Sequence, residues 1–259
     1  MSLQVLVSTM HRTDHSLLDK MNINSDAIVV NQCDCENDSE ENFEYKGHKI
    51  LWLNRNERGV GKSRNLALSQ ATAEIVLFAD DDVIYNGNYV SVIEKAFSEI
   101  DADALVFRAD ILNEARKVNE EEGVKKLSLF NCTRYGAYRI ACKRKIIERE
   151  NITFSLLFGG GAKYGSGEDS VFTADLIKRK LMVYSVPYKI GNVEQSESTW
   201  FKGFNEKYCH DKGALMKTLY GRFWYPLMIV LIKRHPEQYC EIGLRKALKY
   251  AKKGAAEIK

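Results

Sequence analysis

Three consecutive aspartates, Asp80, Asp81 and Asp82, directly follow an apolar run at residues 75–79 that is typical of a buried strand. Crowded carboxylates repel one another and raise one another's pKa, so a positive partner is expected nearby. Ligands of open α/β sheets bind beyond the carboxyl ends of the strands, where carboxylate oxygens suit Mg²⁺ or Mn²⁺. The alternative is a cap for a helix starting near Asn88, for which one aspartate would suffice. The triplet therefore predicts a metal site.

A second acidic pair, Glu168 and Asp169, follows a glycine-rich loop and opens a helical pattern. Acidic residues at a helix start are stabilised by the helix dipole, so a purely structural role is one reading. A carboxylate at the mouth of the same crevice is instead suited to act as a general base. The five glycines of residues 159–167 let backbone approach a ligand or let the loop move, and they fit no dinucleotide-binding spacing.

Short apolar runs alternate with helical patterns along most of the chain, which favours an α/β architecture with parallel strands. Residues 32–48 are polar and acidic and predict a surface loop, and residues 109–130 predict a second charged surface segment. Strands are expected at residues 4–8, 27–31, 49–53, 75–79, 104–108 and 182–186, and helices at residues 61–71, 88–100 and 169–180.

Length and composition describe an ordinary globular protein of 259 residues with 45% apolar and 28% charged residues. The net charge of +3 gives no basic footprint for nucleic acid. The N-terminal residues do not read as a signal peptide, and the longest apolar run, at residues 223–232, is about half a membrane span. The six cysteines contain no C-x-x-C pair, so we expect reduced thiols and a cytoplasmic protein.

The run GVGKS at residues 59–63 looks like the end of a phosphate-binding P-loop. That motif requires a glycine five positions before Gly61, where this chain has Asn56. The mismatch disfavours a P-loop NTPase.

Taken together, the pieces resemble the family 2 glycosyltransferases, which are inverting enzymes with the GT-A fold. The matching segments come in the family's order: two strands with polar ends, VLVSTMHR and AIVVNQCD; then GVGKSRNLALSQATAEIVLFADDDV, with an Arg-Asn helix and a D-x-D strand; then ITFSLLFGGGAKYGSGED. The resemblance covers residues 3–185. It implies a mostly parallel central sheet flanked by helices, with a C-terminal helical appendage.

The resemblance also implies roles for individual donor-site residues. Asp82 and Asp80 would bind the divalent cation, Mn²⁺ or Mg²⁺, with Asp81 or Asp80 contacting the ribose. Thr9 and Asn31 would line the nucleotide base pocket. The second strand ends in Asn31 and Gln32, where the family often has an acidic residue. Which base is recognised therefore stays open.

For the acceptor side, the resemblance implies that Asp169 is the general base and that Glu168 supports it. On the donor side, Arg64 lies where members of the family often contact the nucleotide base. His210 is one candidate to complete the metal site. A lone histidine without ligand spacing has structural explanations too.

The implied activity is transfer of a sugar from a nucleoside-diphosphate sugar, with a UDP-sugar favoured, to a glycan or lipid-linked acceptor in bacterial surface polysaccharide biosynthesis. A nucleotide-binding half at residues 1–108 and an acceptor half at residues 109–200 would form one domain, with a helical extension at residues 201–259. The apolar and basic tail predicts helices that either dock on the core or attach peripherally to an anionic membrane at the cytoplasmic face.

Two other functions use the same acidic crevice. A nucleotidyltransferase that makes sugar nucleotides also needs metal and carboxylates, but it should carry a glycine-rich loop after the first strand, and residues 8–16 lack glycine. A non-catalytic module that binds metal or glycan is the third reading. Metal-dependent binding of one nucleoside diphosphate would favour the glycosyltransferase.

Overall fold

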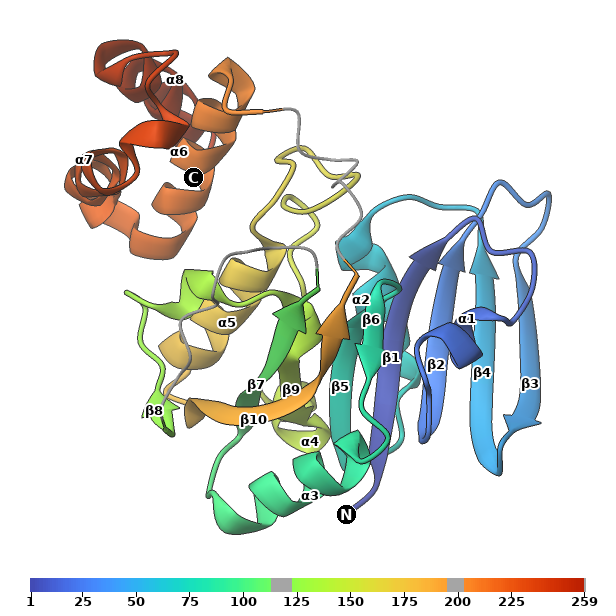
Figure 1. Cartoon of the computed structure of the whole chain (residues 1–259). Helices are drawn as coiled ribbons and strands as arrows, with labels where there is room; N and C mark the ends of the chain where they lie inside the picture. Colours follow the sequence, from blue (N-terminus) through green and yellow to red (C-terminus); the bar gives the residue numbers. More distant parts are fainter. Residues whose placement is uncertain (113–122, 195–202, 259) are drawn as a thin grey trace.

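The computed structural model describes residues 1–112, 123–194 and 203–258, and the predicted domain boundary at residues 200 and 201 lies outside them (Figure 1). A single sheet has the strand order β3-β4-β2-β1-β5-β9-β7-β10-β6, and β8 pairs with β10. The strands are β1 (Leu3–Met10), β2 (Asp26–Gln32), β3 (Ser39–Tyr45), β4 (His48–Arg55), β5 (Ile75–Asp80), β6 (Val83–Tyr85), β7 (Ala104–Ile111), β8 (Lys125–Lys126), β9 (Ile140–Lys143) and β10 (Val183–Val193).

Helices cover both faces of the sheet and continue beyond it at the C-terminus (Figure 1). Residues of α1 and α3 pack into the core on one face, and residues of α2, α4 and α5 pack into the core on the other. The α-helices are α1 (Leu17–Lys20), α2 (Val60–Gln70), α3 (Tyr89–Glu99), α4 (Arg144–Arg149), α5 (Glu168–Lys178), α6 (Glu206–Tyr220), α7 (Trp224–Arg234) and α8 (Leu244–Ala256).

Strands β4, β2, β1 and β5 run parallel to one another, and their register aligns the strand ends that matter for chemistry. Strand β1 lies between β2 and β5, with Thr9 opposite Asn31 and Ser8 opposite Asp80. Because parallel strands end at one edge of a sheet, these polar residues meet there. The six strands and three helices predicted from the apolar pattern are confirmed, with shifts of a few residues at most ends and a larger one for β10, which continues to Val193.

The C-terminal half of the sheet corrects the prediction of a mostly parallel sheet. Strand β9 lies between β5 and β7 and is antiparallel to both, and β6 is antiparallel to β10. The whole sheet is therefore mixed. Strand β9 was missed because its four residues lie among arginines and lysines and are too short to show a period.

The polar segment at residues 32–48 was wrongly predicted to be only a loop, since it contains β3. This strand pairs antiparallel with β4 at the outer edge of the sheet. Most of its side chains are exposed and several are acidic, which discourages pairing with another sheet edge but hides the strand from an apolar pattern. The predicted charged segment at residues 109–130 begins within β7, and its residues 113–122 lie outside the description.

The C-terminal segment folds as helices, as predicted, and forms a lobe beside the sheet domain (Figure 1). Helices α6 and α8 pack with their backbones in contact: a side chain on Gly213 would approach the carbonyl of Ala251, and one on Gly254 that of His210. Leu215 and Leu219 of α6 also join a core with residues of the sheet domain. Within the described residues, every helix is too short or too polar to cross a bilayer.

Candidate active site

Arg64 connects the two acidic groups that the sequence singled out. Its side chain is only 3% exposed, and its Nη2 donates to Asp80 Oδ1 at 2.6 Å while its Nη1 donates to Glu168 Oε1 at 2.9 Å. Asp80 ends β5 and Glu168 begins α5, so one cation joins segments that are 88 residues apart in sequence (168 minus 80). Burial alone would lower the pKa of Arg64, but the two carboxylates outweigh it and raise the pKa above its ordinary value.

Local packing explains why α2 aims Arg64 at this point. The helix begins against the glycine loop, where the Val60 amide donates to the Gly160 carbonyl at 3.0 Å. One turn later, Ser63 Oγ donates to Ser8 Oγ of β1 at 2.9 Å. The Arg64 guanidinium lies 5.2 Å from the centre of the Phe154 ring, a cation–π contact. The helix is thus fixed at both the sheet and the loop.

Asp81 is neutralised by a different cation, which sequence reasoning missed. Thr9 Oγ1 donates to Asp81 Oδ2 at 2.5 Å, and Arg12 Nη2 forms an ion pair with the same oxygen at 2.7 Å. Arg12 Nε also donates to Thr9 Oγ1 at 3.1 Å. The available signal was the position of Arg12, two residues beyond the polar end of β1. Thr9 and Asp81 therefore meet as the predicted donor site requires, with Arg12 added.

Asn31 is buried and its amide is fully used by backbone and side-chain partners. Its Oδ1 accepts from the Arg12 amide at 3.0 Å, and its Nδ2 donates to the Arg12 carbonyl at 2.9 Å and to Asn54 Oδ1 at 2.8 Å. Asn31 thus holds the turn that carries Arg12. Its contact with a base stays a prediction.

Arg64 was predicted to contact the nucleotide base, but its two terminal nitrogens already contact carboxylates within the protein. The positive partner expected for the aspartates is therefore supplied in part by the chain itself. Arg64 neutralises Asp80, and Arg12 neutralises Asp81. This geometry gives Arg64 a bridging role rather than an open face for a base.

Asp82 is the member of the triplet that has no cationic side chain in contact among the described residues. Its pKa is raised to about 6, mainly because burial removes water and also because Asp80 and Asp81 are close. Its backbone carbonyl accepts from the Glu194 amide at 2.8 Å, which fixes the turn after β5. When ionised, this partly buried carboxylate has no positive partner in contact among the described residues, so a bound cation would stabilise it.

The donor set fits a divalent cation only if a ligand supplies further oxygens. Among the residues the structure describes, no three His, Cys, Asp or Glu side chains are arranged to hold an ion by themselves. Mg²⁺ and Mn²⁺ commonly bind through one or two carboxylates together with substrate phosphates. Asp82, with Asp80 beside it, offers this partial set.

Asp169 lies next to Glu168 in the first turn of α5 and is a partly exposed residue. Burial, followed by the charge of Glu168, raises the pKa of Asp169 to about 7. Its Oδ1 accepts from the Ser170 amide at 2.6 Å, which orients the carboxylate. A carboxyl group with a pKa near neutrality is suited to accept and release a proton.

The glycine loop that precedes α5 determines where Glu168 lies. Gly159 has a φ of +107°, and a Cβ there would come within 2.9 Å of the Glu168 carboxyl group. Gly167, at the start of α5, has a φ of +112° and faces Leu215 of α6 at 2.8 Å from an added Cβ. Both positions need glycine because of their backbone conformation and the closeness of their neighbours.

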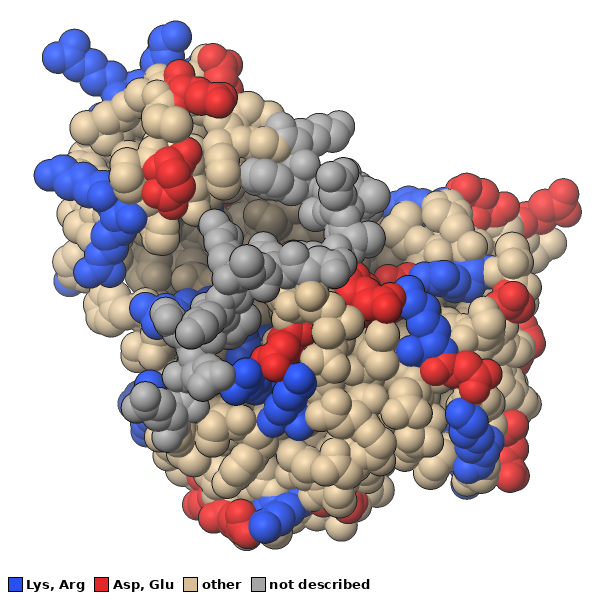
Figure 2. Space-filling model, in the orientation of Figure 1, with Lys and Arg blue, Asp and Glu red and all other residues tan. Residues whose placement is uncertain are grey.

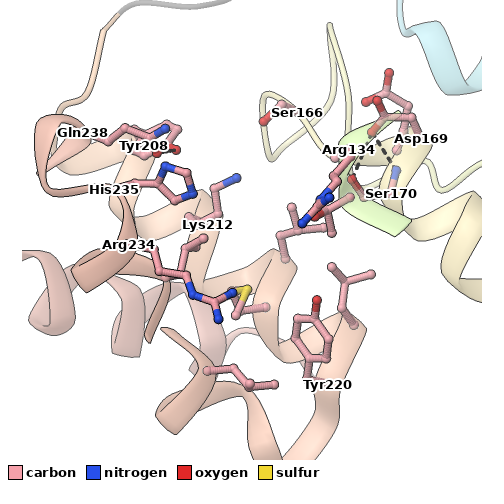
Figure 3. A pocket seen from close by; sticks show the side chains of 18 of the residues that line it. Arg134, Ser166, Asp169, Ser170, Tyr208, Lys212, Tyr220, Arg234, His235 and Gln238 are labelled. Atoms are coloured by element: carbon pink, nitrogen blue, oxygen red, sulfur yellow. Dashed lines mark hydrogen bonds between the residues drawn. The ribbon is translucent and has the colours of Figure 1, made fainter. Parts of the chain in front are cut away.

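A cavity of about 820 Å³ lies between the start of α5 and the C-terminal helices (Figure 3). Asp169 and Ser170 lie on one wall, and residues of α6 and α7 form the opposite wall. Its basic lining residues are Arg134, Lys212, Arg234 and His235. No local pattern in the sequence predicts this cavity, because its lining residues lie up to 108 positions apart, from Phe130 to Gln238 (238 minus 130).

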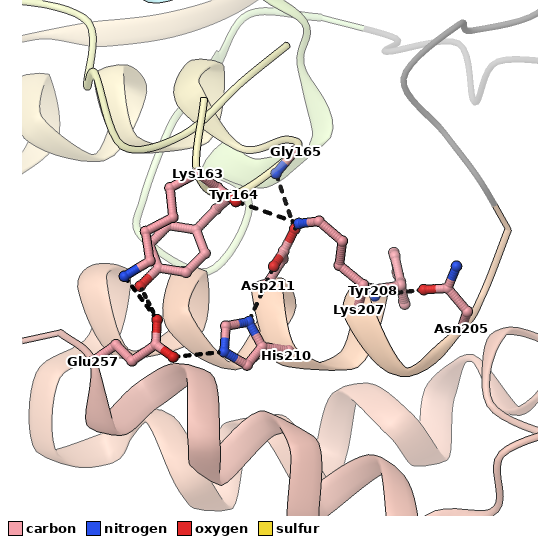
Figure 4. Close-up of polar contacts among 9 residues, drawn as sticks. All are labelled: Lys163, Tyr164, Gly165, Asn205, Lys207, Tyr208, His210, Asp211 and Glu257. Atoms are coloured by element: carbon pink, nitrogen blue, oxygen red, sulfur yellow. Dashed lines mark hydrogen bonds and ion pairs between the residues drawn. The ribbon is translucent and has the colours of Figure 1, made fainter. Parts of the chain in front are cut away.

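His210, one candidate to complete the predicted metal site, lies between two carboxylates of the C-terminal lobe. Its Nδ1 faces Asp211 Oδ1 at 3.1 Å and its Nε2 faces Glu257 Oε1 at 2.9 Å, so both ring nitrogens are engaged (Figure 4). Glu257 also forms an ion pair with Lys163 at 2.9 Å and accepts from Tyr164 Oη at 3.0 Å. The histidine therefore helps to fasten the C-terminal helices to the glycine loop.

Solved glycosyltransferase structures share this arrangement of elements. S. aureus TarS 1–349 in complex with UDP-GlcNAc matches with a TM-score of 0.64 at 17% identity, over 97% of this chain and 79% of the other. The mannosyltransferase PcManGT from Pyrobaculum calidifontis, in complex with GDP-Man and Mn²⁺, matches with a TM-score of 0.51 at 14% identity, over 98% and 74% of the two chains. These likenesses show the fold, which is the GT-A type with a mixed sheet.

The sequence itself places the chain in a family. The model of Glycosyl transferase family 2 matches residues 7–148, more than half of the chain. The chain therefore belongs to glycosyltransferase family 2, as its resemblance predicted. Among curated proteins, none matches it.

Proposed function

We propose that the protein transfers a sugar, with inversion, from a nucleoside-diphosphate sugar to a hydroxyl group of a glycan or lipid-linked acceptor. A UDP-sugar is the favoured donor, and cell-surface polysaccharide biosynthesis is the favoured setting. One observation supports this most: Arg64 joins Asp80 and Glu168, so the predicted metal-binding strand end and the predicted base lie at one place. The solved neighbours in complex with UDP-GlcNAc and GDP-Man share the fold.

The donor half of the proposal rests on the end of β1 and the aspartate triplet. Asp82, with Asp80, would hold the divalent cation, and Thr9, Asn31 and Asp81 would shape the nucleotide pocket. When bound, Mn²⁺ or Mg²⁺ supplies positive charge to the leaving diphosphate. Arg12 is 36% exposed and pairs with Asp81, so we assign it a contact with a phosphate or ribose oxygen of the donor.

The acceptor half rests on Asp169 at the wall of the cavity. In its ionised form, Asp169 accepts the proton of the acceptor hydroxyl as that oxygen forms its bond to the anomeric carbon. The bond from the anomeric carbon to the diphosphate oxygen breaks on the opposite face, and the nucleoside diphosphate leaves with the electron pair. Attack and departure on opposite faces invert the configuration, as in inverting glycosidases.

Arg64 and Glu168 position these groups rather than react. Arg64 holds Asp80 and Glu168 in fixed orientations through two charge-assisted hydrogen bonds. Burial, followed by the charge of Glu168, raises the pKa of Asp169, and the charge of Arg64 opposes this rise. The proposed base is therefore suited to accept a proton near neutral pH.

Peripheral contact with a membrane is a further part of the proposal. Lysine and arginine side chains project from the outer edge of the C-terminal lobe, which also carries some acidic side chains, and both charges mix over the sheet domain (Figure 2). Basic side chains near a surface are attracted to anionic lipid. Flotation with anionic and neutral vesicles tests this, and equal recovery with both would contradict it.

The proposed donor chemistry is tested by calorimetric titration of the protein with UDP and GDP, each with and without Mn²⁺. We expect one nucleoside diphosphate to bind with metal present and Asp82→Asn to weaken that binding. Asp101→Asn is the control, because Asp101 is an exposed carboxylate outside the aspartate triplet. Absence of nucleotide binding, or binding unaffected by metal and by Asp82→Asn, would contradict the proposal. Anomeric NMR of the transfer product then decides inversion.

A further inference from the structure

The cavity beside Asp169 has an unusual balance of charge. Three basic side chains, Arg134, Lys212 and Arg234, line it and have no carboxylate partner among the described residues. The acidic side chains in its lining are Asp169 and Glu168, and Glu168 is already paired with Arg64. The lining is therefore cationic, although the neutralised strand ends lie close by.

The basic side chains come from different walls of the cavity. Arg134 reaches in from the short 3₁₀ helix at Cys132–Arg134, on the side of Asp169. Lys212 of α6 and Arg234 of α7 reach in from the other side (Figure 3). Groups that converge from two sides suit a tetrahedral phosphate, whose oxygens point in several directions, better than a planar carboxylate.

Of the three basic side chains in the cavity, Lys212 would be stabilised most by a bound anion. It is only partly exposed, and desolvation lowers its pKa, with Asp169 opposing that effect. Its ammonium lies 5.4 Å from the centre of the Tyr208 ring. A buried cation without a negative partner is costly, and a bound anion would offset that cost.

Apolar side chains continue the cavity beyond the basic groups. Leu227, Val230 and Leu231 of α7 and Met216 of α6 line it, and Val230 is 43% exposed. A surface that combines cations with an apolar wall can hold a phosphate that is attached to carbon.

We propose that this cavity is the acceptor site and that it selects an acceptor carrying a phosphate group near the hydroxyl to be glycosylated, held by Arg134, Lys212 and Arg234. The proposal rests on the proposed function, because it takes Asp169 as the base. The phosphate lies either in a phosphodiester polymer or in the headgroup of a lipid carrier. In both cases the same three cations bind it, and the apolar wall contacts what is attached.

Binding measurements with small probes test the cavity separately from the donor site. Wild-type protein saturated with nucleoside diphosphate and Mn²⁺ is titrated with glycerol phosphate, geranyl phosphate, glycerol, geraniol and glucuronate. We expect phosphate probes to bind about tenfold or more tightly than their neutral counterparts and glucuronate. If only geranyl phosphate binds, the lipid source is indicated, whereas equal binding of both phosphates indicates the polymer source.

Variants show whether the phosphate binds in the cavity. Arg134→Ala combined with Arg234→Ala should weaken phosphate binding about tenfold or more, and Lys212→Met should act in the same direction. The matched control is Lys233→Ala, because Lys233 precedes Arg234 on α7 and is exposed but does not line the cavity. We expect this control to stay within about twofold of wild type.

The outcomes separate this proposal from the proposed function. If no phosphate probe binds, if neutral probes or glucuronate bind as well, or if the cavity variants bind like Lys233→Ala, the phosphate proposal is overturned. Nucleoside diphosphate binding is measured in the same variants and should be unchanged. Loss of the phosphate preference with intact nucleotide binding would leave the donor assignment standing, whereas failure of nucleotide binding in wild type would overturn the proposed function instead.

Discussion

The strand ends of the parallel half-sheet and the cavity beside α5 differ in how their charges are neutralised. At the strand ends, carboxylates predominate and arginines of the chain pair with two of them, Asp80 with Arg64 and Asp81 with Arg12. In the cavity, cations predominate and Arg134, Lys212 and Arg234 have no carboxylate partner among the described side chains. A charge matched within the chain maintains geometry, whereas an unmatched charge is available to a ligand.

The largest expected effect comes from removing the proposed base, Asp169, from the wall of the cavity. Asp169→Asn removes the proposed base and should lower the turnover number by about 10³ while nucleotide binding stays near wild type. Turnover is measured by product formation and binding by calorimetry. Asp175→Asn on the same helix is the control. Near-normal turnover of Asp169→Asn would show that the carboxylate has no role as base.

The second expected effect tests the matched charges at the strand ends. Arg64→Met leaves two carboxylates without their shared cation and should lower the free energy of unfolding by about 3 kcal/mol. Urea denaturation measures this change. Adding Asp80→Asn and Glu168→Gln should recover much of the lost stability, because the unpaired charges are removed. A triple variant no more stable than Arg64→Met would argue against the charge explanation.

A third prediction concerns the unmatched carboxylate of the triplet. Asp82→Asn should weaken metal-dependent nucleotide binding by about tenfold or more and, in the absence of ligand, make the protein more stable at pH 8, because it removes a partly buried charge from beside two others. Titration and denaturation on the same preparation measure both effects. Loss of stability together with loss of binding would instead indicate a structural role for Asp82.

The smallest expected effect is the dependence of kcat/KM and of stability on pH, which tests the role of Asp169. Its folded pKa of about 7 lies above the ordinary value, so the protonated form predominates below pH 7 and kcat/KM should fall about tenfold per pH unit there. The same shift means that stability from the protonated group is present at low pH and lost as the pH rises through about 7. Comparison with Asp169→Asn isolates both effects, and an unchanged pH profile in that variant would assign them to another group.

The pattern of apolar residues predicted most strands of the sheet. It did not predict strands that are exposed or very short. Strands such as β1 and β5 are buried on both faces and read as continuous apolar runs. Strand β3 is an exposed edge with acidic residues, and β9 has four residues, so neither showed a period. Base-contact roles inferred for Arg64 from resemblance could not anticipate an ion pair with Glu168, which depends on the tertiary fold.

The acidic part of the candidate site was predictable because its residues are clustered in short segments of the sequence. Asp80, Asp81, Asp82, Glu168 and Asp169 stand out because like charges gather in short segments. Arg134, Lys212 and Arg234 are single basic residues among many, and only the packing of α6 and α7 against the sheet domain brings them to one cavity.

The single guanidinium between Asp80 and Glu168 has an electrostatic consequence. Whatever binds at Asp80 competes for its oxygens and changes how strongly Arg64 holds Glu168, whose charge acts on Asp169. If Asp80 binds the donor as we propose, occupation of that pocket changes the electrostatic surroundings of Asp169, the proposed base, through this one shared side chain.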